Sequence, residues 1–209
     1  VNYIFDDSDS WVRRSWMRSL LDIYNKIGGL KAKLRVYADV RDINEENVRI
    51  MKELGVDAVL MGIESGDEQI LRFNGKPITE AMIIKAVKLL GAFDIKLCDA
   101  YLLGLLGESK KSAERTISLA QQLTNYCEKQ ITYWNVIMPL PGSPIWNNMM
   151  KVPSLQEKYG SEYNFDIEEV RKDYIHHFCN LDEDGYNYLI NICNHLQSLQ
   201  NIPLRKYIR

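Results

Sequence analysis

Two segments place polar side chains directly after an apolar run. At residues 59–66, apolar side chains lead into Gly-Ile-Glu-Ser-Gly, and residues 101–109 end similarly in Gly-Leu-Leu-Gly-Glu-Ser. Such runs are typical of strands buried on both faces of a parallel sheet. Because α/β enzymes place their sites at the carboxyl ends of these strands, we predict a site that includes Glu64 and Ser65.

Each candidate side chain has a functional and a structural interpretation. Glu64 can accept the hydroxyls of a ribose, as an acidic residue does in dinucleotide folds, and its alternative role as a helix cap suits Asp67 better. Asp6 and Asp7 follow a short strand. They can bind a metal or an ammonium group, or simply cap the next helix. Both interpretations stay open at this point.

The glycines of residues 104–108 resemble a phosphate loop only superficially. The segment lacks the Walker lysine and the GxGxxG spacing, so its glycines more plausibly let a ligand approach the backbone. Asp39, Arg41 and Asp99 are charges in or just after strands, and structural ion pairs explain them as well as function does.

The order of elements predicts an α/β fold. Apolar periodicity and caps predict alternating strands and helices, with strands at residues 1–5, 34–38, 59–64, 95–103 and 131–138. Right-handed crossovers make these strands parallel. We therefore predict a partial (β/α)6 TIM-like barrel with about five parallel strands over residues 1–146. Residues 147–209 form a C-terminal helical extension, with a loop at 154–165 and helices at 167–178 and 183–199.

Composition narrows the function classes. The chain has 209 residues and a net charge of −2, which gives no sign of a nucleic-acid or membrane surface. No apolar run approaches the roughly 20 residues that cross a bilayer. Four widely separated cysteines match no metal-binding spacing, so we predict no metal ligands, reduced thiols and a cytoplasmic protein.

Several motifs in one order resemble the radical S-adenosylmethionine (SAM) enzymes. They are Ile-Phe-Asp-Asp-Ser at 4–8, Gly-Ile-Glu-Ser-Gly at 62–66, Lys-Pro-Ile-Thr at 76–79, the glycine-rich strand end at 101–109 and Pro-Leu-Pro-Gly-Ser-Pro at 139–144. The resemblance covers residues 1 to about 146. It is strongest to the branch that often carries a cobalamin domain, together with methylthiotransferase-like relatives.

The resemblance implies a SAM site. Asp6 and Asp7 would lie near the methionine amino group, and Glu64 and Ser65 near the ribose and the methionine carboxylate. The adenine would contact two further segments, whose residues are Leu103, Gly104, Leu105, Gly107, Val136, Ile137 and Met138. The implied parent is an oxidoreductase-type enzyme that cleaves SAM reductively at a 4Fe–4S cluster, giving a 5′-deoxyadenosyl radical that acts on a substrate the sequence does not identify. Cobalamin is an expected further cofactor of the parent.

One departure from the family is large. The CxxxCxxC loop that holds the cluster is absent, and no cysteine of this chain replaces it. We therefore expect a fragment that begins after that loop, binds no cluster and is inactive alone. Its first strand would offer an unprotected sheet edge, which favours self-association. The alternatives are a TIM-like metal-dependent enzyme with an acidic site at Asp6, Asp7, Asp39 and Glu64, and a non-catalytic binding module.

Overall fold

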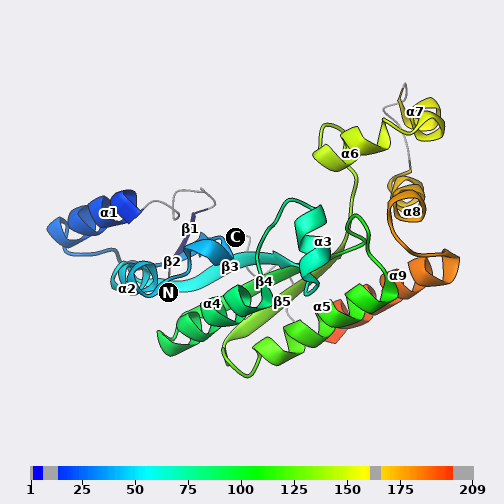
Figure 1. Ribbon diagram of the computed structural model, residues 1–209. Helices are drawn as coiled ribbons and strands as arrows, with labels where there is room; N and C mark the ends of the chain where they lie inside the picture. Colours follow the sequence, from blue (N-terminus) through cyan, green and yellow to red (C-terminus); the bar gives the residue numbers. More distant parts are fainter. Residues whose placement is uncertain (1, 7–13, 161–165, 200–209) are drawn as a thin grey trace. The chain divides into compact units, whose positions relative to one another are not determined.

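A single sheet of parallel strands forms the centre of the fold (Figure 1). The computed structural model describes residues 2–6, 14–160 and 166–199. The strands, in sheet order, are β1 (Asn2–Asp6), β2 (Ala32–Tyr37), β3 (Val56–Glu64), β4 (Lys96–Leu103) and β5 (Gln130–Val136). Sheet order equals chain order, so each strand joins its neighbour through a crossover.

Helices fill the connections and the C-terminal part of the chain. Between the strands lie α1 (Arg14–Lys26), the 3-10 helix η2 (Val40–Asp42), α2 (Glu45–Glu53), α3 (Glu68–Phe73), α4 (Glu80–Ala92) and α5 (Lys110–Leu123). After β5 follow α6 (Pro144–Met149), α7 (Pro153–Tyr159), α8 (Ile167–Phe178) and α9 (Glu183–Leu199). Among these described helices, none has the length and apolar character needed to cross a membrane.

The strand pairing confirms the predicted fold class. β1 with β2, β2 with β3 and β3 with β4 all pair in parallel. β5 runs alongside β4 in the same direction, since Leu97 N–H bonds to the Lys129 carbonyl at one end and Ile137 N–H bonds to the Leu103 carbonyl at the other. Parallel strands alternating with helices make this a partial TIM-like α/β barrel.

The predicted caps fix where several helices begin. The side chains of Asn44, Asp67 and Thr79 each accept a backbone N–H in the first turn of α2, α3 and α4. Glu45 and Glu46 stand in the first turn of α2, where the helix dipole favours carboxylates. These three helices follow the ends of β2 and β3, so their caps also fix the loops that carry the candidate site.

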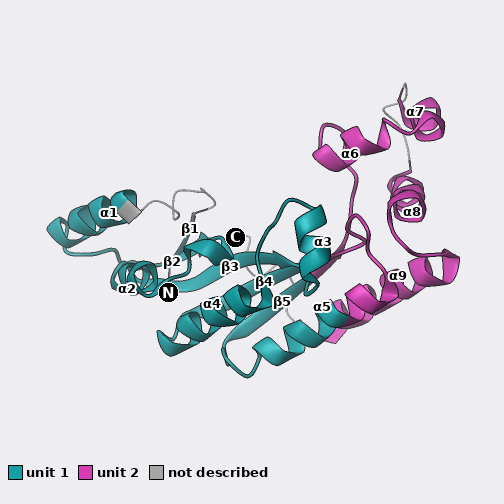
Figure 2. Ribbon diagram, in the orientation of Figure 1, with its two compact units in different colours: residues 1–101, 115–133 teal, residues 102–114, 134–209 magenta. Residues whose placement is uncertain are grey.

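The described structure divides into two compact units (Figure 2). Unit 1 comprises residues 1–101 and 115–133, and unit 2 comprises residues 102–114 and 134–209. Each unit is described separately below. The predicted domain boundary at residue 146 stays a prediction.

Unit 1 has its core between the sheet and the crossover helices. Val59 and Met61 of β3 lie opposite Leu97 and Asp99 of β4 in the register, and all four are almost fully buried. α2 contacts α1, β3 and α4, and in Figure 1 it lies on the same face of the sheet as α4. This apolar layer holds the strand ends that carry the candidate residues.

Some local predictions were wrong. The expected loop at 154–165 contains α7, because Pro153 occupies the first turn of a helix, where its missing N–H costs nothing. Pro144 likewise begins α6 instead of extending the loop before it. Gly91 lies inside α4 and does not end it. A Cβ at Gly91 would lie 2.1 Å from the Tyr126 carbonyl oxygen, so close packing explains this glycine.

The first helix also differs from its predicted form. Met17 is its fully buried residue, whereas Ile27 is 60% exposed and lies beyond the helix end. The predicted cap at Asp9 or Ser10 lies outside the described residues.

Candidate functional site

Glu64 ends β3 in a backbone conformation that glutamate rarely adopts. Its φ is +71°, in the left-handed region, and it lies opposite Tyr101 of β4 in the register. For a residue with a Cβ this conformation costs about 1–2 kcal/mol. Strain of this kind concentrates at functional sites, so the strand end predicted from sequence carries an independent structural sign of function.

The side chain of Glu64 folds back over Gly62 and meets a lysine. Lys76 Nζ lies 3.4 Å from Glu64 Oε1 and also donates to the Gly62 carbonyl. A Cβ at Gly62 would lie 2.1 Å from Glu64 Oε1, so only glycine leaves room for this arrangement. The carboxylate stays one-third exposed, which keeps it accessible to a ligand.

Ser65 lies in a different environment. It is fully buried, its hydroxyl lies 3.1 Å from Thr116 Oγ1, and it accepts the Asp67 N–H at 3.1 Å. A Cβ at Gly66 would lie 2.8 Å from the Arg115 carbonyl oxygen. Ser65 and Gly66 therefore hold the turn after β3 tightly against α5.

Asp67 strengthens the same turn. It caps α3, and Arg115 Nη1 donates to its Oδ2 at 2.6 Å. Burial favours a higher pKa for Asp67, but the Arg115 bond and the capping N–H groups outweigh it and lower the pKa. Asp67, and not Glu64, is thus the helix cap, as the sequence indicated.

Asp39 follows β2 and forms an ion pair. Arg41 donates to both of its carboxylate oxygens, from Nε at 2.8 Å and from Nη2 at 3.1 Å. Burial opposes the charged form, but the Arg41 bonds, with a smaller contribution from Lys76, lower the pKa of Asp39. Asp39 and Glu64 are therefore each balanced by a cation, which disfavours a metal site built on them.

Asp99 lies in the interior, away from the strand end. It is fully buried and accepts a bond from Gln130 Nε2 at 2.9 Å. Burial raises its pKa to about 6, against hydrogen bonds from Tyr101, Thr132 and Gln130 that oppose the rise. Its role is therefore in the core.

In unit 2, Gly104 begins the predicted glycine-rich loop. Its φ is +86°, and a Cβ there would lie 3.0 Å from Ile137 Cγ2 and 3.1 Å from Ile175 Cδ1. Both conformation and packing therefore require glycine. Leu103 and Leu105 on either side are buried, and Gly107 is again left-handed, with a φ of +83°.

The turn at residues 178–180 holds this loop. Gly107 N–H bonds to the Phe178 carbonyl at 2.8 Å, and Asn180 N–H bonds to the Glu108 carbonyl at 2.7 Å. Asn180 Nδ2 also donates to the Gly107 carbonyl at 3.1 Å, and Cys179 Sγ lies 3.3 Å from the Leu105 carbonyl oxygen. The loop is thus fixed by residues more than seventy positions later in the chain.

The segment after β5 borders a pocket of about 720 Å³ within unit 2. Ile137 has both backbone groups bonded, since its N–H meets the Leu103 carbonyl at 2.8 Å and its carbonyl accepts from Arg171 Nε at 3.1 Å. Met138 lies outside β5, and within the described residues no hydrogen bond is formed by its backbone N–H or carbonyl. The pocket is lined by Leu102, Asn135, Val136, Ile137, Met138, Glu168, Arg171, Ile190, Cys193, Asn194 and Gln197.

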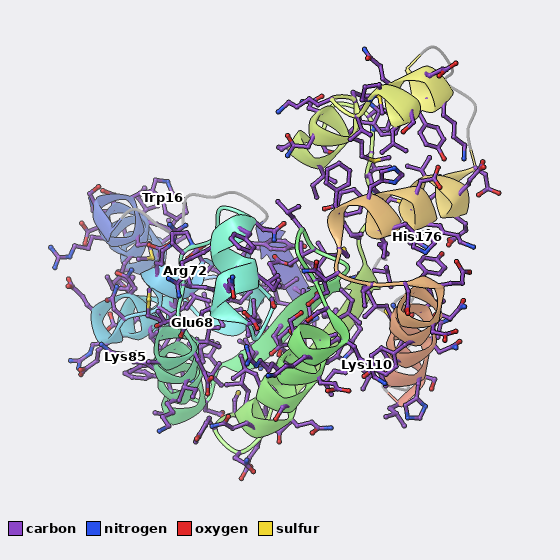
Figure 3. The ribbon with its side chains drawn as sticks, turned by 45° about the vertical axis from the view of Figure 1, so that its right-hand side comes forward. Trp16, Glu68, Arg72, Lys85, Lys110 and His176 are labelled. Atoms are coloured by element: carbon purple, nitrogen blue, oxygen red, sulfur yellow. The ribbon has the colours of Figure 1, made fainter. Side chains whose placement is uncertain are left out.

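The described residues do not fit a 4Fe–4S cluster. No group of three or more His, Cys, Asp or Glu side chains with metal-binding geometry occurs among residues 2–6, 14–160 and 166–199. Burial raises the pKa of the Cys98 thiol to about 11 and that of Cys179 to about 12, which disfavours the thiolate that iron requires. His176, labelled in Figure 3, lies 3.4 Å from Glu183 and against the ring of Tyr186.

A family model decides the relationship. The model of the radical SAM superfamily matches residues 15–120, which is half of the chain. This chain belongs to the radical SAM superfamily. The resemblance drawn from the motifs is therefore confirmed for the family as a whole.

Known radical SAM proteins are longer than this chain. An uncharacterized protein of Methanocaldococcus jannaschii is 29% identical over 164 residues, covering 76% of this chain and 30% of that protein. Two solved structures share the fold. The archaeal Elp3 of Methanocaldococcus infernus, with an N-terminal deletion, has a TM-score of 0.55 at 16% identity, over 83% of this chain and 45% of that one. The methyltransferase TsrM of Kitasatospora setae, with cobalamin and a [4Fe-4S] cluster bound, has a TM-score of 0.53 at 17% identity, over 66% and 26%.

The structure adds residues that sequence reasoning missed. Lys76 belonged to a motif, but its contact with Glu64 comes from a loop twelve residues away and has no local pattern. Arg171 and Asn180 lie in a region where no motif was found, and only the fold brings them to the predicted segments. Asp6 ends β1, and Asp7 lies outside the described residues.

Proposed function

We propose that this chain is the SAM-binding core of a radical SAM enzyme. In the complete protein, SAM would supply a sulfonium carbon–sulfur bond that is cleaved reductively at a 4Fe–4S cluster. Family membership supports this function. The observation that carries it is Glu64, a strained, accessible carboxylate at the carboxyl end of β3.

Unit 1 would recognise the ribose and methionine end of SAM. We assign Glu64 to the ribose hydroxyls, because a carboxylate accepts two O–H donors well. Asp6 and Asp7 are assigned to the methionine amino group from the family resemblance. Ser65 has its hydroxyl already engaged, so we assign it to hold the turn that presents Glu64.

Unit 2 would recognise the adenine end. Leu103, Gly104, Leu105 and Gly107 are assigned to its apolar face. The backbone of Val136, Ile137 and Met138 is assigned to its edge. Because both backbone groups of Ile137 are bonded within the protein, Met138 is the residue with a donor and an acceptor to offer.

No step through the iron–sulfur cluster is assigned to the described residues, because they do not fit it. We propose instead that the chain alone binds no cluster and does not turn over SAM. Use of cobalamin by the complete protein, the identity of its substrate and a cytoplasmic location stay predictions from the sequence.

Equilibrium dialysis with radiolabelled SAM tests this function. We expect saturable binding by the wild-type chain and binding about tenfold or more weaker for Glu64→Gln, since a hydrogen bond to a charged group contributes about 1.5–3 kcal/mol. Glu68→Gln is the matched control. Glu68 lies on α3 beside Arg72, as Figure 3 shows, and is not assigned to the ligand. Equal affinities for the two variants, or no saturable binding by wild type, would refute the proposal.

A further inference from the structure

The C-terminal part of unit 2 contacts both segments assigned to adenine. The turn at 178–180 holds the loop at 104–108 through three hydrogen bonds, and Arg171 of α8 holds the segment after β5. Ile175, also on α8, packs where a Cβ of Gly104 would lie. One helix and the turn after it therefore determine where both segments lie.

Arg171 is well suited to a positioning role. Its side chain is only 13% exposed, and its planar guanidinium makes contacts in three directions. Nε donates to the Ile137 carbonyl at 3.1 Å, Nη1 donates to Glu168 at 2.6 Å, and Nη2 lies 3.8 Å from the Met138 sulfur. Glu168 is largely exposed, so it orients the guanidinium without burying a second charge.

The bond to Ile137 has a consequence for the neighbouring residue. With its N–H held by Leu103 and its carbonyl held by Arg171, Ile137 has both peptide groups fixed in orientation. The next peptide group, at Met138, then has little freedom to rotate. Its unbonded N–H and carbonyl are presented at the pocket in one arrangement, which reduces the entropy lost when a ligand binds.

We propose that Arg171 and Asn180 are positioning residues that set the affinity of this chain for SAM, by fixing the Met138 backbone and the 104–108 loop. This inference rests on the proposed function. It assigns the helices after β5 to the binding site itself.

Amide hydrogen exchange and SAM affinity together test the proposal. Arg171→Met removes the guanidinium and keeps an apolar stem. We expect exchange at Ile137 to rise about tenfold without ligand, and SAM binding to weaken about tenfold. Glu168→Gln is the control, because it removes the exposed ion pair but leaves the Nε bond, and both quantities should stay within about twofold of wild type.

Asn180→Ala is a second, independent variant. It removes a side-chain bond from the loop at 104–108, so exchange at Gly107 should rise while exchange at Ile137 does not change. Weaker SAM binding by this variant, with an unchanged midpoint of urea unfolding, would support positioning over general destabilisation.

Three outcomes would overturn the inference. They are unchanged exchange at Ile137 in Arg171→Met, unchanged SAM affinity in both variants, and an equal effect of Glu168→Gln. If wild type fails to bind SAM, the proposed function fails, but the exchange data still decide whether Arg171 orders the segment after β5.

Discussion

Replacing Glu64 by asparagine should separate function from stability. Asparagine tolerates the left-handed region, so Glu64→Asn should recover about 1 kcal/mol of backbone strain at the φ of +71°. The substitution also removes the contact with Lys76. Because both side chains are partly exposed, at 22% for Lys76 and 33% for Glu64, that pair contributes about 0–1 kcal/mol. The free energy of unfolding should therefore stay the same or rise by up to about 1 kcal/mol.

Urea unfolding and SAM binding should be measured on the same preparations. Binding should weaken about tenfold or more while stability does not fall. Asp94→Asn is a matched control, since Asp94 is the other described non-glycine residue in this region, with a φ of +54°, and its carboxylate pairs with Lys129. It should leave SAM binding unchanged. Destabilisation of Glu64→Asn by more than about 2 kcal/mol would show that the carboxylate is structural and would refute this reasoning.

Three further predictions follow from the core, the turn and the cysteines. Burial raises the pKa of Asp99 to about 6, against about 4 in the unfolded chain, so the folded state binds this proton more tightly and the group costs stability as pH rises through this interval. Asp99→Asn should therefore stabilise the protein by up to about 3 kcal/mol at pH 7 and by almost nothing at pH 4, and equal effects in urea unfolding at the two pH values would contradict this. Gly66→Ala should lower the thermal midpoint strongly, because its Cβ would lie 2.8 Å from the backbone of Arg115, whereas Gly62→Ala need only displace the flexible Glu64 carboxylate and should weaken SAM binding with little loss of stability. Anaerobic reconstitution with iron and sulfide should leave no cluster absorption after desalting, and one cluster per chain would be the contrary result.

The sequence predicted the architecture well, because caps and apolar periodicity act locally. Asn44, Asp67 and Thr79 were predicted as caps from residue type and position alone, and the structure confirms each. Family motifs likewise located Glu64 and Gly104 at strand ends.

Long-range contacts could not be predicted in the same way. Neither the burial of the Ser65 hydroxyl against Thr116 nor the bond between Arg171 and Ile137 has a local pattern, since each joins residues more than thirty positions apart. The helix α7 was missed because polar and aromatic residues obscured its short apolar face, of which Leu155 and Tyr159 are buried.

Hydrogen exchange of the wild-type chain with and without SAM tests the central proposal most directly. We predict slower exchange in peptides that cover residues 62–66, 104–107 and 136–138, and no change in α1. Saturating SAM that protects none of these peptides, or that protects only other parts of the chain, would contradict the assignment of this chain as a SAM-binding core.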